Sequence, residues 1–350
     1  MIKRIGIFTS GGDAPGMNTA VVSVARSAAE HGIKLMAIKR GFNGILGLNE
    51  NPDDDITELD LETALDIAGQ RGTFLRTARC LEFINPEVQK QAADNLRKLG
   101  IDAIVVIGGD GSFTGALKLA NLGIPCIGIP GTIDNDLGFT ESTLGYDTAV
   151  NVCVEAVRSV RATSRSHDRP GVVQVMGRNA GDIAMRTAMA TGAEMLIVPE
   201  MEWDIDVVAE RLNKLIAMGN TRATLVMGEH CWHKMKPFDW HTFLNENGKK
   251  VYPGEALTAE RVASILKRKC GGIEVRATVI GYTQRGAEPM AFDSAFAFEA
   301  GHLAVKLLNR GETNQAIGVR HGRVFNMPLQ DALNIPKQFN KEMYDLINRL

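Results

Sequence analysis

Residues 2–16 of the chain read IKRIGIFTSGGDAPG and join a short apolar run to a glycine-rich turn. The run up to Thr9 predicts a buried strand, and the residues after the turn predict a helix to about Glu30. Backbone N–H groups in such a turn, together with the dipole of the following helix, favour a phosphate group. The turn lacks both the Walker pattern and GxGxxG spacing, so glycine's backbone freedom alone remains an alternative explanation.

The same order of strand, loop and helix recurs along the chain. A second unit has a strand at 101–107, a glycine-rich loop at 108–112 and a helix through Leu122, and a strand at 125–129 then leads into a long loop at 130–144. Alternation of this kind is typical of βαβ units and parallel sheets. Further helices are expected at about 145–165 and 292–308, and strands of a second sheet at 172–176, 195–198, 223–227 and 275–280. We therefore predict an α/β fold of two Rossmann-like, three-layer domains with mainly parallel sheets and a cleft between them.

The chain has 350 residues, which is more than one hydrophobic core usually serves. We expect one domain at 1–145 plus about 285–335 and a second domain at 146–284 plus about 336–350. Residues 231–255 lack clean periodicity and predict a surface insertion.

Composition limits the classes of function. The formal net charge is −2, so no overall field recruits nucleic acid or an acidic membrane surface. The five cysteines are odd in number and show no CxxC pair, which suits a reducing compartment. No signal-peptide pattern precedes the first strand and no apolar run approaches a membrane span. We therefore expect a cytoplasmic protein that binds neither nucleic acid nor membrane.

Carboxylates within two of the loops indicate phosphoryl transfer. Asp110 lies in a loop suited to phosphate, and a bridging Mg²⁺ would remove the conflict between the two negative charges. Asp134 and Asp136 lie beside the hydroxyl of Thr132, and Asp134 could be the base that such a reaction requires. A turn rich in Asx residues is the alternative for this third loop.

Five motifs in order closely resemble the bacterial-type phosphofructokinase family. They are TSGGDAPGMN at 9–18, IGGDGS at 107–112, PGTIDND at 130–136, VMGR at 175–178 and QRG at 284–286. The resemblance implies transfer of the γ-phosphate of ATP to the 1-hydroxyl of fructose 6-phosphate, which gives fructose 1,6-bisphosphate and ADP in glycolysis. It also implies Mg²⁺ as cofactor and a homotetramer with active sites shared between subunits. By the same resemblance, the domain at 1–145 plus about 285–335 is expected to bind ATP and Mg²⁺, and the domain at 146–284 plus about 336–350 to bind fructose 6-phosphate.

Residue roles follow from the resemblance alone. The implied catalytic residues are Asp134 as base, Arg178 as the group that stabilises the transferring phosphate, and Thr132 as a positioning group. The implied nucleotide site is Gly12, Arg79, Cys80, Gly109, Asp110, Gly111 and Ser112, with Asp110 on the metal. The implied substrate residues are Thr132, Ile133, Asp134, Arg169, Met176, Gly177, Arg178, Glu229, Arg276, Tyr282, Thr283, Gln284 and Arg285, of which Arg169 and Arg276 reach the 6-phosphate from a neighbouring subunit.

Two glycines favour ATP as the phosphoryl donor. Gly111 and Gly131 leave space beside a triphosphate, where pyrophosphate-using relatives usually carry Asp and Lys. A pyrophosphate-dependent phosphofructokinase is the closest alternative, and a lipid- or NAD-kinase relative is a more distant one. A non-catalytic regulatory paralogue is a third, although it would usually lack Asp110 or Asp134.

The chain departs from the family pattern at several positions. Tyr282 stands where the family commonly has His, so affinity for the 6-phosphate would depend more on Arg276 and Arg285. Three residues match contacts of the family's effector site: Arg26, Arg161 and Glu194. At four other positions of that site, where the family normally has basic side chains, this chain has Val22, Leu61, Met218 and Asn220. We therefore expect weak or absent regulation by ADP and phosphoenolpyruvate.

Overall fold

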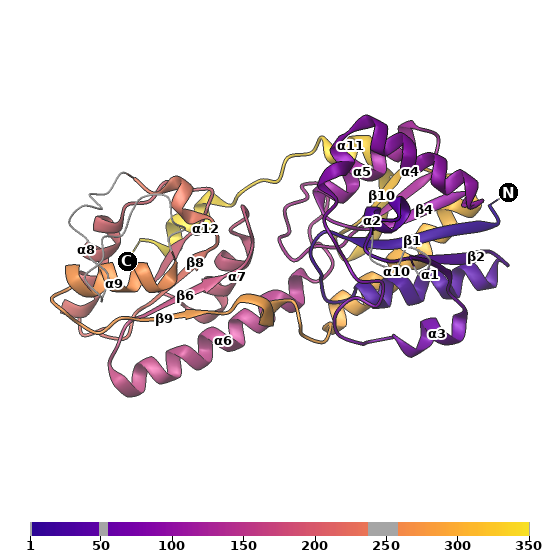
Figure 1. Ribbon diagram of the computed structural model, residues 1–350. Helices are drawn as coiled ribbons and strands as arrows, with labels where there is room; N and C mark the ends of the chain where they lie inside the picture. The colour runs from indigo at the N-terminus through magenta and orange to yellow at the C-terminus, as the bar shows by residue number, and fades with distance from the viewer. Residues whose placement is uncertain (1, 49–54, 237–257, 350) are drawn as a thin grey trace. The chain divides into compact units, whose positions relative to one another are not determined.

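A computed structural model describes residues 2–48, 55–236 and 258–349, and its chain divides into two compact units. Unit 1 comprises Met1–Ala149 and Arg285–Gln338, and unit 2 comprises Val150–Gln284 and Phe339–Leu350. Residues 237–255 of the predicted insertion lie outside the described residues, while Cys231–Lys234 form a short 3-10 helix, η3. Each unit is an α/β structure, which confirms the predicted fold class (Figure 1).

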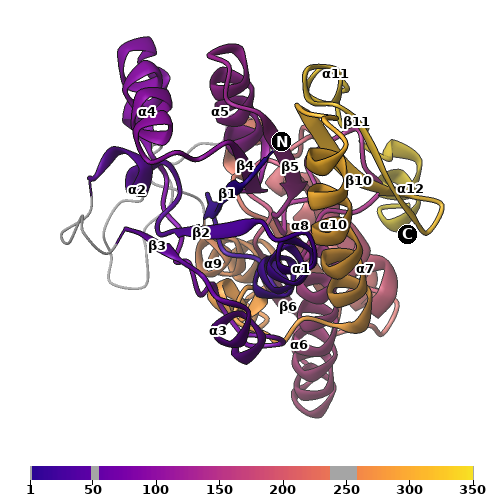
Figure 2. The ribbon, with the colours of Figure 1, turned by 90° about the vertical axis from the view of Figure 1, so that its right-hand side faces the viewer.

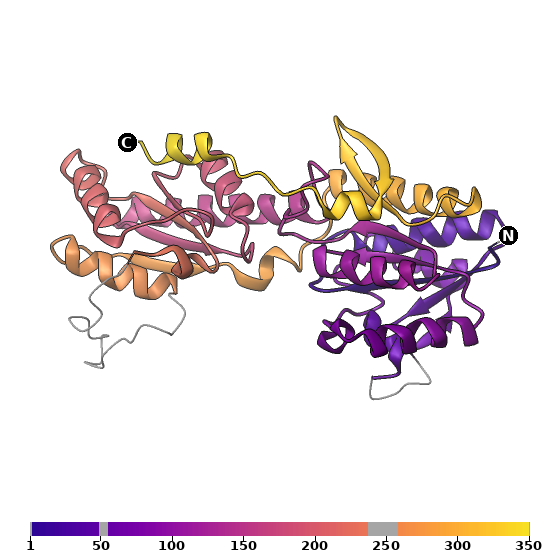
Figure 3. The same cartoon turned by 90° about the horizontal axis from the view of Figure 1, so that it is seen from above.

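Unit 1 is built on a seven-stranded sheet in the order β11-β10-β5-β4-β1-β2-β3. The five central strands are parallel, and β3 and β11 pair antiparallel at the edges. The hairpin of β10 and β11 comes from the returning end of the chain (Figure 3, yellow-orange). The strands are β1 (Arg4–Ser10), β2 (Lys34–Ile38), β3 (Ile56–Glu58), β4 (Ala103–Gly108), β5 (Cys126–Pro130), β10 (Gln315–Arg320) and β11 (Arg323–Pro328).

Helices cover both faces of this sheet. Figure 2 shows α4 (Pro86–Lys98), α5 (Asp110–Asn121) and α11 (Leu329–Leu333) on one face, with α1 (Met17–Glu30) and α10 (Ala291–Asn309) on the other. The shorter helices of this unit are α2 (Phe42–Leu46), α3 (Leu61–Asp66) and η2 (Leu81–Ile84). The central strands β4 and β5 are apolar and buried along their whole length because helices cover the sheet from both sides.

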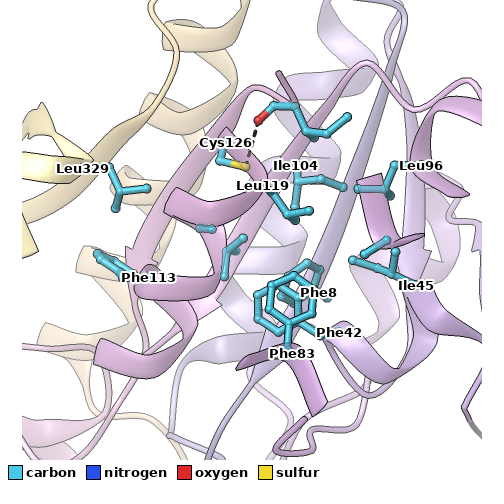
Figure 4. Close-up of a cluster of buried hydrophobic side chains, with 14 of the residues drawn as sticks. Phe8, Phe42, Ile45, Phe83, Leu96, Ile104, Phe113, Leu119, Cys126 and Leu329 are labelled. Atoms are coloured by element: carbon cyan, nitrogen blue, oxygen red, sulfur yellow. Dashed lines mark hydrogen bonds between the residues drawn. The ribbon is translucent and has the colours of Figure 1, made fainter. Parts of the chain in front are cut away.

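Aromatic rings fill the core between the sheet and α4 and α5 (Figure 4). The ring centroids of Phe8 and Phe42 are 4.9 Å apart, and those of Phe42 and Phe83 are 4.1 Å apart. Cys126 lies in the same core, where burial raises the pKa of its thiol. All five cysteines are free thiols, in agreement with the absence of a disulfide framework expected from the sequence.

Unit 2 has a parallel four-stranded sheet in the order β7-β8-β6-β9. Its strands are β6 (Gly171–Val175), β7 (Met195–Ile197), β8 (Thr224–Gly228) and β9 (Arg276–Val279), and a 3-10 turn, η5 (Gly281–Gln284), follows β9. Its helices are α7 (Asp182–Thr191), α8 (Ile205–Ala217), α9 (Ala259–Lys269) and α12 (Lys341–Ile347). Helices α8 and α9 pack their apolar faces on one side of the sheet, around Leu212, Val262 and Leu225.

Helix α6 (Tyr146–His167) contains the boundary between the units, after Ala149. Asp293 of α10 binds its first turn: the carboxylate accepts hydrogen bonds from the N–H groups of Gly145 and Thr148, each at 2.8 Å, and from the Thr148 hydroxyl at 2.6 Å. This fully buried carboxylate therefore supplies the cap that the start of α6 needs. Within the described ranges, no helix combines the length and the apolar character that crossing a bilayer requires.

Candidate active site

The loop at 11–16 follows β1 and ends at α1. Gly11 and Gly16 have φ angles of 92° and 94°, which a glycine adopts without strain. A Cβ on Gly12 would lie 2.7 Å from Nη1 of Arg285, so glycine is needed for the guanidinium to approach the backbone. The same Nη1 donates to the carbonyl of Asp13 at 2.8 Å. The residue best able to place positive charge on this loop therefore comes from the far end of the chain.

The segment containing Arg79 and Cys80, which is predicted to bind the nucleotide, lies beside this first loop. Gly11 N–H donates to the carbonyl of Ala78 at 3.3 Å, and the Thr77 hydroxyl donates to the Gly11 carbonyl at 3.0 Å. Arg79 is exposed, whereas Cys80 is half-buried, and burial raises the pKa of its thiol. The structure thus brings these two predicted residues to the edge of the first loop.

The second loop joins β4 to α5, which starts at Asp110. Gly109 is the N-cap and has no side chain to cap the first turn, while the N–H groups of Ser112 and Phe113 donate to its carbonyl, each at 3.0 Å. The N–H groups of Asp110 and Gly111, at the start of the helix, are therefore the ones available to an anion. Asp110 and Gly111 are exposed, and no heavy atom lies within 4 Å of a Cβ built on Gly111. Ser112 is buried, with its side chain against Gly108. This end of α5 has room for a phosphate chain beside the exposed carboxylate of Asp110.

The third loop follows β5 and carries Thr132 and Asp134. The Asp134 N–H donates to Oγ1 of Thr132 at 3.2 Å, and the Thr143 hydroxyl donates to the carbonyl of Thr132 at 2.5 Å. Asn135, at φ 51°, accepts from the N–H of Thr143 at 3.0 Å. Asp134 is 8% exposed, and Nη2 of Arg285 lies 3.9 Å from its Oδ1. The loop therefore holds a nearly buried carboxylate beside a guanidinium group.

These three loops meet because β5, β4 and β1 are neighbouring parallel strands whose carboxyl ends share one edge of the sheet. Gly131 N–H donates to the carbonyl of Gly108 at 3.0 Å, and a Cβ on Gly109 would lie 3.4 Å from that of Thr132. This edge is where α/β sheets bind ligands. The predicted residues of unit 1 that it brings together are Gly12, Gly109, Asp110, Gly111, Ser112, Thr132, Asp134 and Arg285.

At this edge, one prediction is narrowed and another needs correction. Ile133 is 0% exposed, so only its backbone is available to a substrate. Gly131 does not leave space beside a ligand: a Cβ there would lie 2.8 Å from both Ile107 Cγ2 and Met17 Cε, inside the packing of β4 and α1. Of the two glycines, only Gly111 therefore supports the prediction that there is room for ATP. The sequence did not show this, because the direction of a Cα–Cβ bond depends on the path of the loop.

In unit 2, the predicted residues Met176, Gly177, Arg178 and Glu229 gather at the carboxyl ends of the neighbouring strands β6 and β8. Arg178 is exposed with a φ angle of 55°, and its N–H donates to Oε2 of Glu229 at 3.2 Å. The side chain of Arg178 is thus exposed, on a backbone held by the carboxylate. Unit 2 offers a cation and a carboxylate oxygen at this edge.

Arg169 and Arg276 lie at the opposite edge of the same sheet, where β6 and β9 begin. Both pair with Glu274, Arg169 through Nη1 at 2.6 Å and Arg276 through Nη2. Hydrogen bonding from Arg169 and the charges around it hold the pKa of Glu274 below its usual value. The sequence reasoning missed Glu274, although its place two residues before Arg276 in an extended segment puts both side chains on one face.

The turn after β9 holds the remaining predicted substrate residues. Tyr282 is 81% exposed, and the Thr283 hydroxyl donates to the carbonyl of Ile280 at 2.7 Å. Gln284 is 0% exposed and its Oε1 accepts from the N–H of Met176 at 2.8 Å. The Gln284 side chain is therefore engaged with the protein rather than presented to a ligand.

Comparison with known proteins places this geometry in a family. The phosphofructokinase family model matches residues 4–308, and the chain belongs to that family. It is 40% identical to the ATP-dependent 6-phosphofructokinase 1 of Clostridium perfringens and 41% identical to the ATP-dependent 6-phosphofructokinase of Paenibacillus macquariensis. Both alignments span 100% of this chain and 99% of the relative.

Solved structures give the same family. A phosphofructokinase structure from Saccharomyces cerevisiae is 29% identical with a TM-score of 0.79, and the match covers 99% of this chain but 50% of that chain. A Pichia pastoris phosphofructokinase in the T-state is 30% identical with a TM-score of 0.81, covering 95% of this chain and 36% of the other. This chain therefore spans half or less of each yeast polypeptide.

Proposed function

We propose that this protein is an ATP-dependent 6-phosphofructokinase that transfers the γ-phosphate of ATP to the 1-hydroxyl of fructose 6-phosphate. The observation that carries the proposal is the meeting of the Asp110 loop and the Asp134 loop at one edge of the unit 1 sheet, with Arg285 beside Asp134. Two relatives that are 40% and 41% identical over the whole chain are named as ATP-dependent 6-phosphofructokinases, which supports the same reaction. The products are fructose 1,6-bisphosphate and ADP, and the reaction belongs to glycolysis.

In the proposed mechanism, Asp134 accepts the proton of the sugar 1-hydroxyl as that oxygen bonds to the γ-phosphorus and the bond to ADP breaks. A base contributes about 10²- to 10⁴-fold to such a step. Thr132 holds the loop through its hydroxyl and carbonyl. Arg178 stabilises the negative charge on the transferring phosphate, for which a guanidinium fork is suited.

Mg²⁺ is proposed as the cofactor, held by Asp110 together with the phosphate oxygens of ATP. A single exposed carboxylate at the start of α5 fits Mg²⁺, which usually takes one or two carboxylates and fills its other positions with phosphates and water. The metal would supply charge neutralisation for the phosphates.

The open space at Gly111 favours ATP over pyrophosphate. The deciding experiment measures fructose 1,6-bisphosphate formation with either ATP or pyrophosphate as the sole donor. We expect activity with ATP and less than about a hundredth of it with pyrophosphate, a discrimination of roughly 3 kcal/mol. Activity with pyrophosphate alone would identify the alternative enzyme, and inactivity with both would favour the regulatory paralogue.

We also propose that ADP and phosphoenolpyruvate regulate this protein weakly or not at all. The residues concerned are those that align with the effector site of the family. In unit 2, Arg161, Arg165, Arg222, Met218 and Asn220 line a cavity of about 410 Å³. Arg161 is neutralised there by a two-pronged pair with Glu194 at 2.8 and 3.1 Å. Arg165 and Arg222, which the sequence reasoning did not count, leave the cavity partly cationic.

The remaining effector residues in unit 1 lie around an apolar hollow. Arg26 lies 5.6 Å from the ring centroid of Phe298, and Leu61 lines the same cavity of about 650 Å³. A rate curve in fructose 6-phosphate that shifts strongly with either effector would contradict the proposal of weak regulation.

A cytoplasmic homotetramer with shared active sites is proposed as the assembly. Its support within the chain is the position of Arg169 and Arg276 at the edge of the sheet opposite to Arg178 and Glu229. A strand of five residues separates those edges, at about 3.3 Å per residue, so one copy of unit 2 presents its phosphate-binding arginines on two sides. Sedimentation analysis at catalytic concentration tests the tetramer.

A further inference from the structure

The segment at 176–181 joins β6 to α7 and carries Arg178. Arg178 has a φ angle of 55° and Gly177 one of 140°, and Ala180 N–H closes the turn on the Gly177 carbonyl at 2.8 Å. A left-handed backbone is unfavourable for an arginine and persists where the surrounding structure imposes it. The contacts that hold this segment therefore decide where the guanidinium group points.

Gln284 holds the first end of the segment. Its side chain is 0% exposed, and its Oε1 accepts from the N–H of Met176 at 2.8 Å. Its Nε2 has no hydrogen-bond partner among the residues that the structure describes. A buried amide is costly unless its bonds offset the loss of water, so the bond to Met176 is the contact that accounts for an amide at this position.

Glu200 holds the second end. Its Oε1 accepts from the N–H of Gly181 at 2.7 Å, just before α7 begins. Burial raises the pKa of this carboxyl group, and within the described chain its buried Oε2 makes no hydrogen bond. A Cβ on Gly181 would lie 2.5 Å from Val198 Cβ and 2.7 Å from Glu200 Oε2, so only glycine lets the segment lie this close to the carboxylate.

The middle of the segment has its own contacts. Glu229 accepts from the N–H of Arg178 at 3.2 Å, and Nδ1 of His230 lies 2.8 Å from Oδ1 of Asn179. Glu229 and His230 directly follow β8, which is the neighbour of β6 in the sheet. The side chains that bind the two ends are buried or half-buried, whereas Arg178 is exposed.

We propose that Gln284 and Glu200 are positioning residues for Arg178, which fix the two ends of the 176–181 segment so that the guanidinium group meets the transferring phosphate. The inference rests on the function proposed above for Arg178. In this inference, Gln284 positions Arg178 instead of contacting the substrate as the sequence predicted. Glu200, for which the sequence predicted no role, has the same positioning role. A shift of about 1 Å in such a group can lower a rate 10²-fold, so small displacements of the ends should affect turnover.

Two substitutions remove one holding bond each. Gln284→Met keeps the buried volume but removes the acceptor for Met176, and Glu200→Ala removes the acceptor for Gly181. Each is expected to lower kcat roughly 10- to 100-fold while the KM for ATP changes less than about threefold. Glu200→Gln retains an oxygen for Gly181 and is expected to restore kcat to within about threefold of the wild-type value, whereas Glu200→Ala is not.

The same substitutions in an Arg178→Lys background show whether the effect passes through Arg178. Lysine keeps the charge but lacks the planar fork whose direction the segment sets. We expect the cost of Gln284→Met and Glu200→Ala to fall below about threefold in that background, measured by single-turnover transfer of labelled γ-phosphate. An equal cost in both backgrounds, or no cost in the wild-type background, would overturn the inference.

Asn348→Ala is the matched control. Asn348 accepts from the N–H of Leu196 at 3.1 Å and donates to its carbonyl at 3.0 Å, so it holds the backbone of β7 within the same unit. We expect this variant to lower the thermal midpoint without lowering kcat. If Arg178→Lys itself retained full activity, the role proposed for Arg178 would fail, an outcome distinct from failure of the coupling.

Discussion

In unit 1, Nη2 of Arg285 lies 3.9 Å from Oδ1 of Asp134, and both side chains are largely buried. The other branch of the guanidinium group donates to the carbonyl of Asp13, so one arginine connects the first loop of the chain with the loop that carries the proposed base. The positively charged guanidinium group of Arg285 therefore lies between the carboxylate of Asp134 and the glycine-rich first loop, which is suited to bind phosphate. The guanidinium group thus lies at ion-pair distance from the proposed base.

Replacing Asp134 by Asn should abolish most of the activity. Asn keeps the shape but accepts no proton, and we expect kcat to fall about 10²- to 10⁴-fold in a coupled assay with ATP. Asp102→Asn is the control, because Asp102 accepts from the N–H groups of Lys3 and Arg4 at the opposite edge of the same sheet and should leave kcat unchanged. Near-normal activity of Asp134→Asn would contradict the mechanism.

Two glycine-to-alanine changes should differ in their effect on stability. A Cβ on Gly131 would meet Ile107 and Met17 at 2.8 Å, and overpacking of this kind costs about 1–3 kcal/mol. Gly111 lies in the first turn of α5 with open space around it, so Gly111→Ala should leave stability unchanged or raise it by up to about 1 kcal/mol. Urea denaturation of the two variants measures the difference, and equal destabilisation would refute the assignment of space.

Asp293 should make stability depend on pH below neutrality. Burial raises its pKa to about 6, although hydrogen bonds from Thr148 and Gly145 act in the opposite direction. Because the folded-state pKa lies above the unfolded value, this contribution is fully present below about pH 4 and is lost as the pH rises through 6. We expect the wild type to lose about 2 kcal/mol relative to Asp293→Asn between pH 4 and pH 7. A pH-independent difference between the two proteins would show that Asp293 stays ionised throughout.

Glu194 should have the opposite dependence on pH. Burial alone would raise its pKa, but hydrogen bonds from Arg161 and from the N–H of Thr224 outweigh burial and hold the pKa below its usual value. The stabilisation is therefore present at neutral pH and is lost as the pH falls through the folded-state pKa. Glu194→Gln should cost about 1–3 kcal/mol at pH 7, with a smaller penalty at pH 3.

The control for Glu194 is Glu58→Gln, which breaks the Lys34–Glu58 pair at the surface. Those side chains are 56% and 52% exposed, so the change should stay within about 0.5 kcal/mol at either pH. Thermal midpoints at the two pH values measure both variants. A penalty for Glu194→Gln as small as that of the control would contradict a stabilising role for the Arg161–Glu194 pair.

Much of the fold followed from local patterns. Short apolar runs predicted the strands β1, β4 and β5, with their ends correct to within about two residues. The apolar stripe at helical spacing predicted the long helix α6. The strand β2 and the hairpin of β10 and β11 were not predicted. The hairpin joins the sheet because the end of the chain returns and pairs β10 with β5, whereas β2 joins it by pairing with β1.

The candidate site was predictable in its parts but not in its arrangement. Asp110, Thr132 and Asp134 could be chosen from their motifs because the loops that carry them lie next to buried strands. Glu274 could not, since its meaning depends on Arg169, which comes from a different strand. Glu200 likewise carries no local signal, because its contact with Gly181 forms only when β7 and α7 pack together.

The sequence by itself determined the alternation of strands and helices, the three loops at the ends of strands and the membership of a family, because these are carried by adjacent residues. Only the tertiary structure decided that Arg285 stands beside Asp134, that Gln284 is buried and that Gly131 has no free space. Those facts depend on which strands become neighbours and on the direction of each Cα–Cβ bond. Both are set by packing over the whole unit rather than by any one segment.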